Sequence, residues 1–269
     1  MTKSGTERIT AAFSHAKQKQ TAALMPYFTL GYPDAATSLD IIEAIAPYSD
    51  LLELGVPFSD PLADGPTVQH STQISLENGT TTASCLAMVR ELRQRGVQTP
   101  IMLMGYVNPI LAYGEEKYVR DAADAGADGF IVPDLPPEEA ESLDSKAAEA
   151  GLALIPFLAP TSNPSRIQMV TAQARGFIYL LSVTGVTGAR SKMQMDLADF
   201  VQRVREKTAV PLAVGFGISN PTQAAKVGEL ADGVIIGSAL INAVNAAEDK
   251  VDAAVRFVKS LREGLQMEL

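Results

Sequence analysis

A glutamate stands inside an apolar run that has the composition of a buried strand. Glu53 is surrounded by leucines in Leu51-Leu-Glu-Leu-Gly55. An unpaired carboxylate in such surroundings is costly to ionise and tends to keep its proton. Two interpretations follow from the residues alone. Glu53 bonds a buried backbone group or an arginine, or it is a general acid and base with a raised pKa.

Two aspartates follow Glu53 in a proline-rich stretch, Asp60 and Asp64. Either carboxylate could simply form an Asx turn, and for Asp60 this alternative is as good as a functional one. Asp64, in Ala-Asp-Gly-Pro, is the better candidate for a second polar group over the same site.

Glycines cluster near the other end of the chain, in Gly215-Phe-Gly217 and in Ile236-Gly-Ser238. Backbone amides that are left free at glycines and at helix N-termini bind phosphate. Gly185-Val-Thr-Gly188 could supply further amides. The alternative is that these glycines serve only tight turns.

Other kinds of chemistry lack the residues they need. A Schiff-base aldolase requires a lysine at a strand end, and no predicted strand carries one. The two histidines, His15 and His70, are too few for a three-histidine metal site, and no metal is expected. No Ser-His-Asp or Cys-His set is evident. The residues therefore predict carboxylate acid–base chemistry on a small phosphorylated substrate, by a lyase or an isomerase.

Eight short apolar runs alternate with segments of helical period, and they predict the elements that position these side chains. Such near-continuous apolar runs are typical of parallel strands covered on both faces. Eight strand–helix units indicate an α/β fold, a (β/α)₈ TIM barrel that forms a single domain over residues 1–269 with an N-terminal helix. An open doubly wound sheet is the alternative, but no Gly-x-Gly-x-x-Gly turn follows the first run. The predicted strands are Leu24–Leu30, Leu51–Leu54, Ile101–Gly105, Gly129–Val132, Leu152–Leu158, Phe177–Leu181, Leu212–Gly215 and Gly233–Ile236.

The clearest predicted helices lie between these strands, and two more helix starts are marked by Asn163-Pro164 and Asn220-Pro221. Two connections are long enough to be predicted as functional loops at the carboxyl ends of strands, Val56–Thr82 and Val183–Met195. The four clearest helices are Leu39–Ala46, Ala83–Arg95, Tyr118–Ala125 and Glu138–Ala150.

Composition excludes several classes of protein. The 269 residues include 22 basic and 31 acidic side chains, a formal charge of −9, and no basic run, so nucleic acid is not expected as a partner. The single cysteine, Cys85, cannot form an intrachain disulfide and is expected to pack in the interior. No apolar run has transmembrane length, so we expect no membrane association and a cytoplasmic protein.

The run from Leu51 to Pro66, which reads Leu-Leu-Glu-Leu-Gly-Val-Pro-Phe-Ser-Asp-Pro-Leu-Ala-Asp-Gly-Pro, resembles the signature of the tryptophan synthase alpha chain family. The resemblance continues in order along nearly the whole chain, so chance agreement is negligible. The further matching segments are Pro26–Pro33, Met104-Gly-Tyr-Val-Asn-Pro109, Val132-Pro-Asp-Leu-Pro-Pro137, Phe157-Leu-Ala-Pro-Thr161, Tyr179-Leu-Leu-Ser182, Gly185-Val-Thr-Gly188 and Gly215-Phe-Gly-Ile-Ser219.

The resemblance implies a retro-aldol cleavage of indole-3-glycerol phosphate into indole and glyceraldehyde 3-phosphate. It makes Glu53 the general acid and base, Asp64 the partner of the indole N–H, and Tyr179 an active-site tyrosine; an ordinary aromatic filling the barrel is the alternative for Tyr179. It also implies a substrate-binding set for the phosphate and the indole ring. The phosphate positions are Thr187, Gly188, Gly217, Gly237 and Ser238, and the indole positions are Tyr27, Met104 and Ile131.

By the same resemblance the partner is a β subunit that carries pyridoxal phosphate, in an α₂β₂ tetramer, and the chain itself needs no cofactor. Val183 and Arg190 depart from the enterobacterial pattern and match plant and many bacterial members. Some of these members are stand-alone lyases that release free indole, so this function stays open, and a plant-type source would imply the plastid stroma. A non-catalytic module that activates the partner is disfavoured, because it would be free to lose Glu53 and Asp64.

Overall fold

The computed structural model describes residues 3–181, 190–215 and 217–266. These residues form nine strands, all paired in parallel with their neighbours. Most strand residues are buried, as their apolar composition requires, since helices cover the outer face. The strands are β1 (Ala23–Thr29), β2 (Leu52–Gly55), β3 (Ile101–Met104), β4 (Gly129–Ile131), β5 (Ala153–Ile155), β6 (Phe157–Leu158), β7 (Ile178–Leu181), β8 (Leu212–Gly215) and β9 (Gly233–Ile236).

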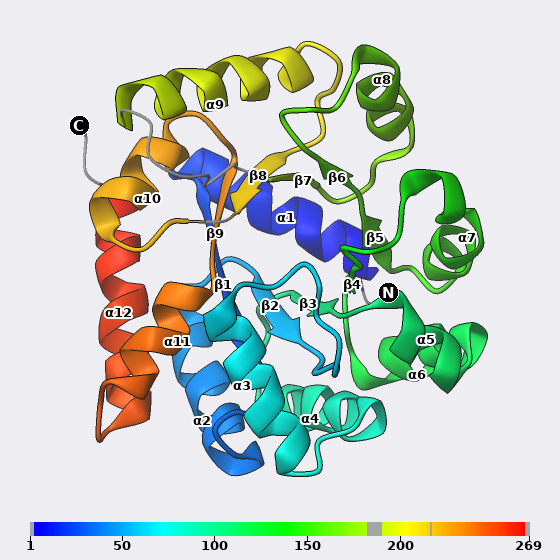
Figure 1. Ribbon diagram of the computed structural model, residues 1–269, viewed down its shortest axis with the longest axis vertical. Coiled ribbons are helices and arrows are strands. Elements are labelled where there is room, and N and C mark those ends of the chain that lie inside the picture. The colour runs from blue at the N-terminus through cyan, green and yellow to red at the C-terminus, as the bar shows by residue number, and fades with distance from the viewer. Residues whose placement is uncertain (1–2, 182–189, 216, 267–269) are drawn as a thin grey trace.

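Helices surround the strands, which lie in the middle of the view in Figure 1. This arrangement is the predicted α/β barrel, and the predicted fold class is confirmed. The described residues also form two short 3₁₀ helices, η1 (Ala46–Tyr48) and η2 (Pro137–Glu139). The α-helices are α1 (Gly5–Gln18), α2 (Ala35–Ile45), α3 (Pro66–Glu77), α4 (Thr82–Gln94), α5 (Val107–Tyr113), α6 (Glu115–Ala125), α7 (Glu141–Glu149), α8 (Pro164–Gln173), α9 (Arg190–Arg205), α10 (Pro221–Gly228), α11 (Ser238–Asn245) and α12 (Lys250–Leu265).

One predicted strand, Leu152–Leu158, is divided at Pro156 into β5 and β6. β5 pairs with β4, whereas β6 pairs with β7, so these two segments stand at opposite ends of the strand order. Proline has no N–H to donate, but the carbonyl of Pro156 accepts a hydrogen bond from the N–H of Tyr179 at 2.9 Å. The barrel wall is therefore closed at this point by the chain itself. The other seven predicted strands match the observed ones to within one residue at either end.

The helix starts at Asn163-Pro164 and Asn220-Pro221 are confirmed. The side chain of Asn163 accepts from the N–H of Arg166 at 2.8 Å, and that of Asn220 accepts from the N–H of Gln223 at 3.0 Å. Each asparagine thus satisfies one backbone donor that the first turn leaves free. Three of the four clearest helices are confirmed, and the fourth, Glu138–Ala150, is split between η2 and α7.

The prediction of one long loop over Val56–Thr82 is wrong, because α3 occupies Pro66–Glu77. Its buried positions include Ser71, Thr72 and Ser75, so the apolar period that marks a helix is missing. Pro66 in the first turn was the available start signal. The second predicted loop, Val183–Met195, is also too long, because α9 begins at Arg190.

Helix α1 covers the amino-terminal ends of the strands. Ser4 and Glu7 form a capping box at its start, and the N–H of Thr6 donates to the carbonyl of Gly151 at 3.2 Å. Arg8 forms an ion pair with the buried carboxylate of Asp128 at 3.0 Å. These contacts close one end of the barrel, so a ligand site must open at the other end.

Candidate functional site

A cavity of about 730 Å³ opens at the carboxyl ends of the strands and brings together most of the predicted site residues. This volume suits a small organic ligand. Carboxylates from β2 and from the segment after it stand in the same cavity as the glycines that follow β8 and β9. The predicted site residues in its wall are Tyr27, Glu53, Asp64, Met104, Tyr179, Gly217, Gly237 and Ser238.

Glu53 lies in β2 with its side chain turned into the barrel. The residue is 1 % exposed, and Oε2 has no hydrogen-bond partner among the described residues. Burial, and to a smaller extent the nearby Asp64 carboxylate, raises the pKa of Glu53 to about 8. No described arginine pairs with Glu53, so the ion-pair alternative for this residue is wrong. Its carboxyl group is a neutral acid at neutral pH, with an oxygen left for a ligand.

Asp64 lies between β2 and α3 and faces the same space. Burial raises the pKa of its carboxyl group to about 6, although the hydrogen bond from Tyr106 opposes this shift. Tyr106 Oη donates to Asp64 Oδ2 at 2.9 Å and accepts from the N–H of Ala63 at 3.0 Å. The tyrosine thereby orients both the carboxylate and the backbone of this segment. Near pH 7 the site contains a protonated Glu53 and an ionised Asp64.

Tyr106 was not predicted as a site residue. It stands two residues after the end of β3, at the edge of the barrel where catalytic side chains gather. That position was the available signal, because the tyrosine falls within the Met104–Pro109 motif.

Two buried tyrosines inside the barrel each place their hydroxyl group against a glycine of the neighbouring strand, where no other residue leaves enough space. A β-carbon at Gly55 would collide with the hydroxyl of Tyr27, and a β-carbon at Gly215 would collide with that of Tyr179. Burial is the main cause that raises the pKa of both phenols far above the usual value. Both are therefore neutral. Tyr179 also packs against Phe157, with ring centroids 4.8 Å apart.

The opposite end of the cavity is formed by backbone. Gly217 adopts a φ of +78°, a left-handed conformation that favours glycine. Gly237 precedes the first turn of α11, and Ser238 begins that helix. A helix N-terminus presents free N–H groups and partial positive charge. This end can hold an anion without any basic side chain.

Some predicted residues do not form this cavity. Ile131 is fully buried and is absent from the described lining of this cavity, so its place in an indole slot stays a prediction. Thr187 and Gly188 lie outside the described residues. Asp60 is exposed and accepts from the hydroxyl of Ser59 at 2.6 Å. His15 and His70 are exposed.

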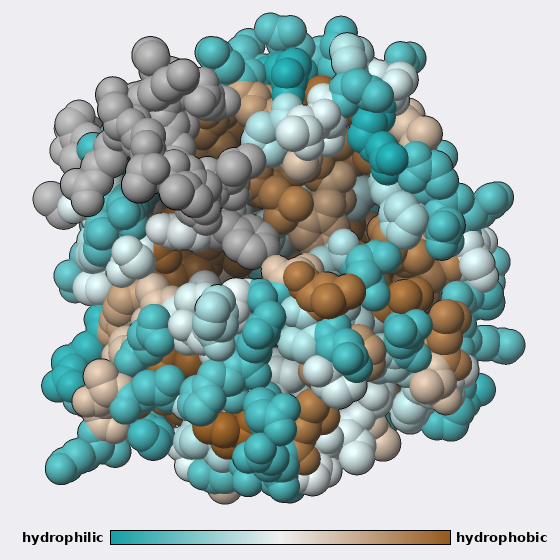
Figure 2. Space-filling view, in the orientation of Figure 1, coloured by the Kyte–Doolittle hydropathy of each residue, from teal (hydrophilic) through white to brown (hydrophobic). Residues whose placement is uncertain are grey.

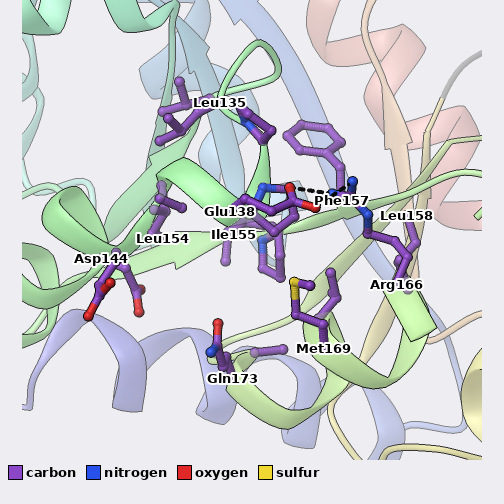
Figure 3. Close-up of a pocket in the computed structure, with 18 of the residues that line it drawn as sticks. Leu135, Glu138, Asp144, Leu154, Ile155, Phe157, Leu158, Arg166, Met169 and Gln173 are labelled. Carbon is purple, nitrogen blue, oxygen red and sulfur yellow. Dashed lines mark hydrogen bonds and ion pairs between the residues drawn. The ribbon is translucent and has the colours of Figure 1, made fainter.

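A second, larger cavity of about 1310 Å³ lies between α7 and α8, where Phe157 and Leu158 approach Met169 (Figure 3). Arg166 forms an ion pair with Glu138 there at 2.7 Å, drawn as a dashed line in Figure 3. None of the carboxylates among its described lining residues is buried, whereas Glu53 in the smaller cavity is. The smaller cavity is therefore the candidate active site.

Within the described parts of the chain, no group of three or more histidine, cysteine, aspartate or glutamate side chains could hold a metal ion. No helix there is both long enough and apolar enough to cross a membrane. Cys85 is buried, and burial raises the pKa of its thiol, so the expectation of an unreactive packing cysteine is confirmed.

Known proteins resemble this chain over nearly its whole length. The alpha chain of tryptophan synthase from Chloroflexus aurantiacus is 49% identical over 257 residues, which covers 94% of this chain and 97% of that protein. The alpha chain from Roseiflexus sp. is 48% identical and covers 95% and 99%. The crystal structure of subunit alpha from Legionella pneumophila superposes with a TM-score of 0.89 at 35% identity, covering 96% of this chain and 98% of that one.

A structure of Mycobacterium tuberculosis tryptophan synthase contains a chain that superposes with a TM-score of 0.88 at 35% identity, covering 97% and 99%. The family model described as tryptophan synthase alpha chain matches residues 13–268. Because that model and these relatives span nearly its whole length, the chain belongs to the tryptophan synthase alpha chain family.

Proposed function

We propose that this cavity cleaves indole-3-glycerol phosphate into indole and glyceraldehyde 3-phosphate, which is the reaction of a tryptophan synthase alpha chain. The protein is a carbon–carbon lyase of tryptophan biosynthesis. One observation carries the assignment of roles. A buried carboxyl group, Glu53, is neutral, has a free oxygen, and faces the same cavity as the N-terminus of α11.

Glu53 acts first as an acid and then as a base. Its proton passes to the ring carbon that bears the glycerol chain, which makes the indole ring cationic and able to accept an electron pair. The Glu53 carboxylate then takes the proton of the hydroxyl group next to the ring, and that carbon becomes the aldehyde. The electrons of the broken carbon–carbon bond return to the ring. Glu53 ends protonated, as it began.

Asp64 stabilises the cationic ring. Its carboxylate accepts a hydrogen bond from the indole N–H, which strengthens as positive charge develops. Tyr106 holds this carboxylate in place through its bond to Oδ2. A charge that is already oriented stabilises the transition state without reorganisation at the moment of reaction.

The remaining lining residues bind the substrate. Tyr27, Met104 and Tyr179 enclose the ring, and the backbone at Gly217, Gly237 and Ser238 takes the phosphate. Thr187 and Gly188 add contacts to the phosphate in this proposal. None of these steps requires a cofactor on this chain.

The proposed partner is a tryptophan synthase β subunit in an α₂β₂ tetramer, with pyridoxal phosphate bound by the partner. The structure from M. tuberculosis is of tryptophan synthase, and one of its chains matches this one over 99% of its length. Leu62, in the same segment as Asp64, is 92% exposed, which suits a covering protein surface. The stand-alone lyase considered from the sequence finds no support in these relatives.

Replacement of the acid tests the assignment. Glu53→Gln preserves shape but cannot deliver or take the proton, so we expect the release of indole from indole-3-glycerol phosphate to fall by at least about a hundredfold. Glu229→Gln, at an exposed position that does not line the cavity, is the control and is expected to keep wild-type activity. Both variants are assayed alone and with a β subunit. Near wild-type turnover by Glu53→Gln would reject Glu53 as the acid.

A further inference from the structure

A line of three buried hydroxyl groups joins the cavity to helix α3. Tyr27 Oη lies 3.3 Å from Thr29 Oγ1, and Thr29 Oγ1 lies 2.7 Å from Ser71 Oγ. Thr29 and Ser71 are fully buried, and Tyr27 is 6 % exposed. Neither Thr29 nor Ser71 is among the described residues that line the cavity.

The far end of this line favours one direction for the hydrogen bonds in it. Ser71 Oγ donates to the carbonyl oxygen of Val68 at 2.8 Å, and a carbonyl can only accept. A hydroxyl group has one proton, so a Ser71 hydroxyl that donates to Val68 accepts from Thr29, and Thr29 then accepts from Tyr27. The phenol proton of Tyr27 is therefore turned toward Thr29 and away from the cavity.

Tyr27 stands next to the catalytic carboxyl group. It is the register partner of Glu53 across β1 and β2, and both residues line the cavity. The titratable groups that face this part of the cavity are Asp64 and Tyr106 after β2 and β3, and Tyr179 on β7. A phenol proton aimed into the cavity would stabilise a carboxylate there, whereas phenol lone pairs favour a neighbour that carries a proton.

We propose that Thr29 and Ser71 are positioning residues, which hold the Tyr27 proton away from the cavity so that the phenol presents only lone pairs to Glu53 and Glu53 stays protonated. This proposal rests on the role of Glu53 as the acid. It explains why a tyrosine can stand beside that carboxyl group without donating a hydrogen bond to it.

A purely structural role for the serine would be to fasten α3 to β1, and helix α3 contains a matched control for it. Ser75, one turn after Ser71, is equally buried and donates to the carbonyl of Leu30 on the same side of the sheet at 2.6 Å. Ser75 has no bond to Thr29 or Tyr27. Ser71→Ala and Ser75→Ala each remove one buried hydrogen bond made by a serine of α3. Only Ser71→Ala allows the hydrogen bond between Thr29 and Tyr27 to reverse its direction.

The test compares the pH dependence of kcat/KM for indole release. We expect the wild-type alkaline limb near pH 8, where Glu53 loses its proton. Ser71→Ala lets Thr29 donate to Tyr27 and lets the phenol proton turn toward Glu53. Its alkaline limb should move down by about half to one pH unit, the size of a hydrogen-bond effect on a buried acid. Ser75→Ala should leave the limb in place even where its thermal stability falls equally.

Substitutions at Thr29 keep the proposal testable if Ser71→Ala folds poorly, and a Tyr27→Phe background gives a further check. Thr29→Val should move the limb like Ser71→Ala, and Thr29→Ser should restore it, because the hydroxyl returns. In a Tyr27→Phe background, Ser71→Ala should no longer move the limb, because there is no phenol proton to turn.

The proposal would be overturned if the alkaline limb of the pH profile lay at the same pH in wild type, Ser71→Ala and Thr29→Val. It would also be overturned if Ser71→Ala still shifted this limb in the Tyr27→Phe background. These outcomes are separate from failure of the proposed function. An active Glu53→Gln variant would reject Glu53 as the acid. An inactive Glu53→Gln variant, together with an unchanged alkaline limb in Ser71→Ala and Thr29→Val, would reject only the positioning role of Thr29 and Ser71.

Discussion

The burial of the Glu53 carboxyl group has a thermodynamic consequence. Its pKa is about 8 in the folded protein and 4.5 as an ordinary exposed group. As the pH rises between these values, the unfolded chain releases this proton and the folded protein keeps it. The stability that Glu53 contributes is therefore fully present below about pH 4.5 and is lost as the pH rises through 8.

We expect Glu53→Gln to remove this loss. Over pH 4.5 to 8, the free energy of unfolding of the wild type should fall relative to that of the variant, by at most about 5 kcal/mol, because each pKa unit corresponds to about 1.4 kcal/mol. Urea unfolding of both proteins at several pH values measures the difference. Parallel pH dependences would show that the folded-state pKa of Glu53 is not raised.

How much of the site could be predicted from the sequence depends on how unusual each residue is in its setting. A glutamate within an apolar strand is rare, so Glu53 could be identified from its neighbours alone. Thr29 and Ser71 could not, since hydroxyl residues occur in strands and helices everywhere. Their relation depends on the packing of α3 against β1, which no local pattern encodes.

At the scale of the elements, the N-terminus of α11 carries the proposed phosphate site. Ser238→Asp places a carboxylate at this terminus, which suits the helix itself but repels a phosphate. We expect glycerol phosphate to bind at least about tenfold more weakly, since like charges in one site cost several kcal/mol. Ser238→Ala, which keeps the backbone amides, should bind within about threefold of wild type. Isothermal titration decides, and equal affinities for the two variants would place the phosphate elsewhere.

The closed end of the barrel gives a prediction for the fold alone. Asp128 is buried between Arg8 and Arg93, at 3.0 and 2.7 Å, and also accepts from the N–H of Ile101 at 2.7 Å. Asp128→Ala leaves the Arg93 guanidinium buried without its counter-charge, so we expect a loss of about 3–5 kcal/mol in unfolding free energy. Arg8→Ala removes only the more exposed partner and should cost about 1 kcal/mol or less. Similar losses in both variants would contradict this difference.

The elements themselves could be predicted where one pattern dominated. Fully buried parallel strands are continuous apolar runs, so the strand bounds were nearly right. Helix α3 was missed because it packs small polar side chains, Ser71 and Ser75, whose hydroxyls bond to backbone carbonyls. The division at Pro156 could not be predicted, because it depends on which neighbouring strand each half of the apolar run pairs with. That pairing is determined by closure of the whole barrel and not by the local sequence.

On the scale of the whole molecule, the face in Figure 2 is hydrophilic around much of its rim, with hydrophobic side chains nearer the middle. Leu62 is almost fully exposed in the segment that also carries Asp64. A partner that covers this segment would fix Asp64 and exclude water. We therefore expect the isolated chain to be a slow lyase that a β subunit accelerates.

Limited proteolysis tests the same idea. Trypsin cleaves after Arg190 and Lys192, at the start of α9, directly after the Gly185–Gly188 segment proposed to meet the phosphate. Glycerol phosphate and a β subunit together should slow this cleavage by holding the segment against the ligand. The measure is the rate at which the fragment pair from cleavage after Arg190 or Lys192 appears. Equal rates with and without ligand and partner, or full activity of the isolated chain, would favour independence from a partner.

The division of one strand at Pro156 determines how the barrel is held closed. β5 pairs with β4 and β6 with β7, and the two strands follow one another in the chain, so covalent bonds join the two ends of the sheet. The N–H of Tyr179 adds a hydrogen bond to the carbonyl of Pro156 at 2.9 Å. In the described strand order, this joint is therefore the place where loss of interstrand hydrogen bonds cannot open the barrel.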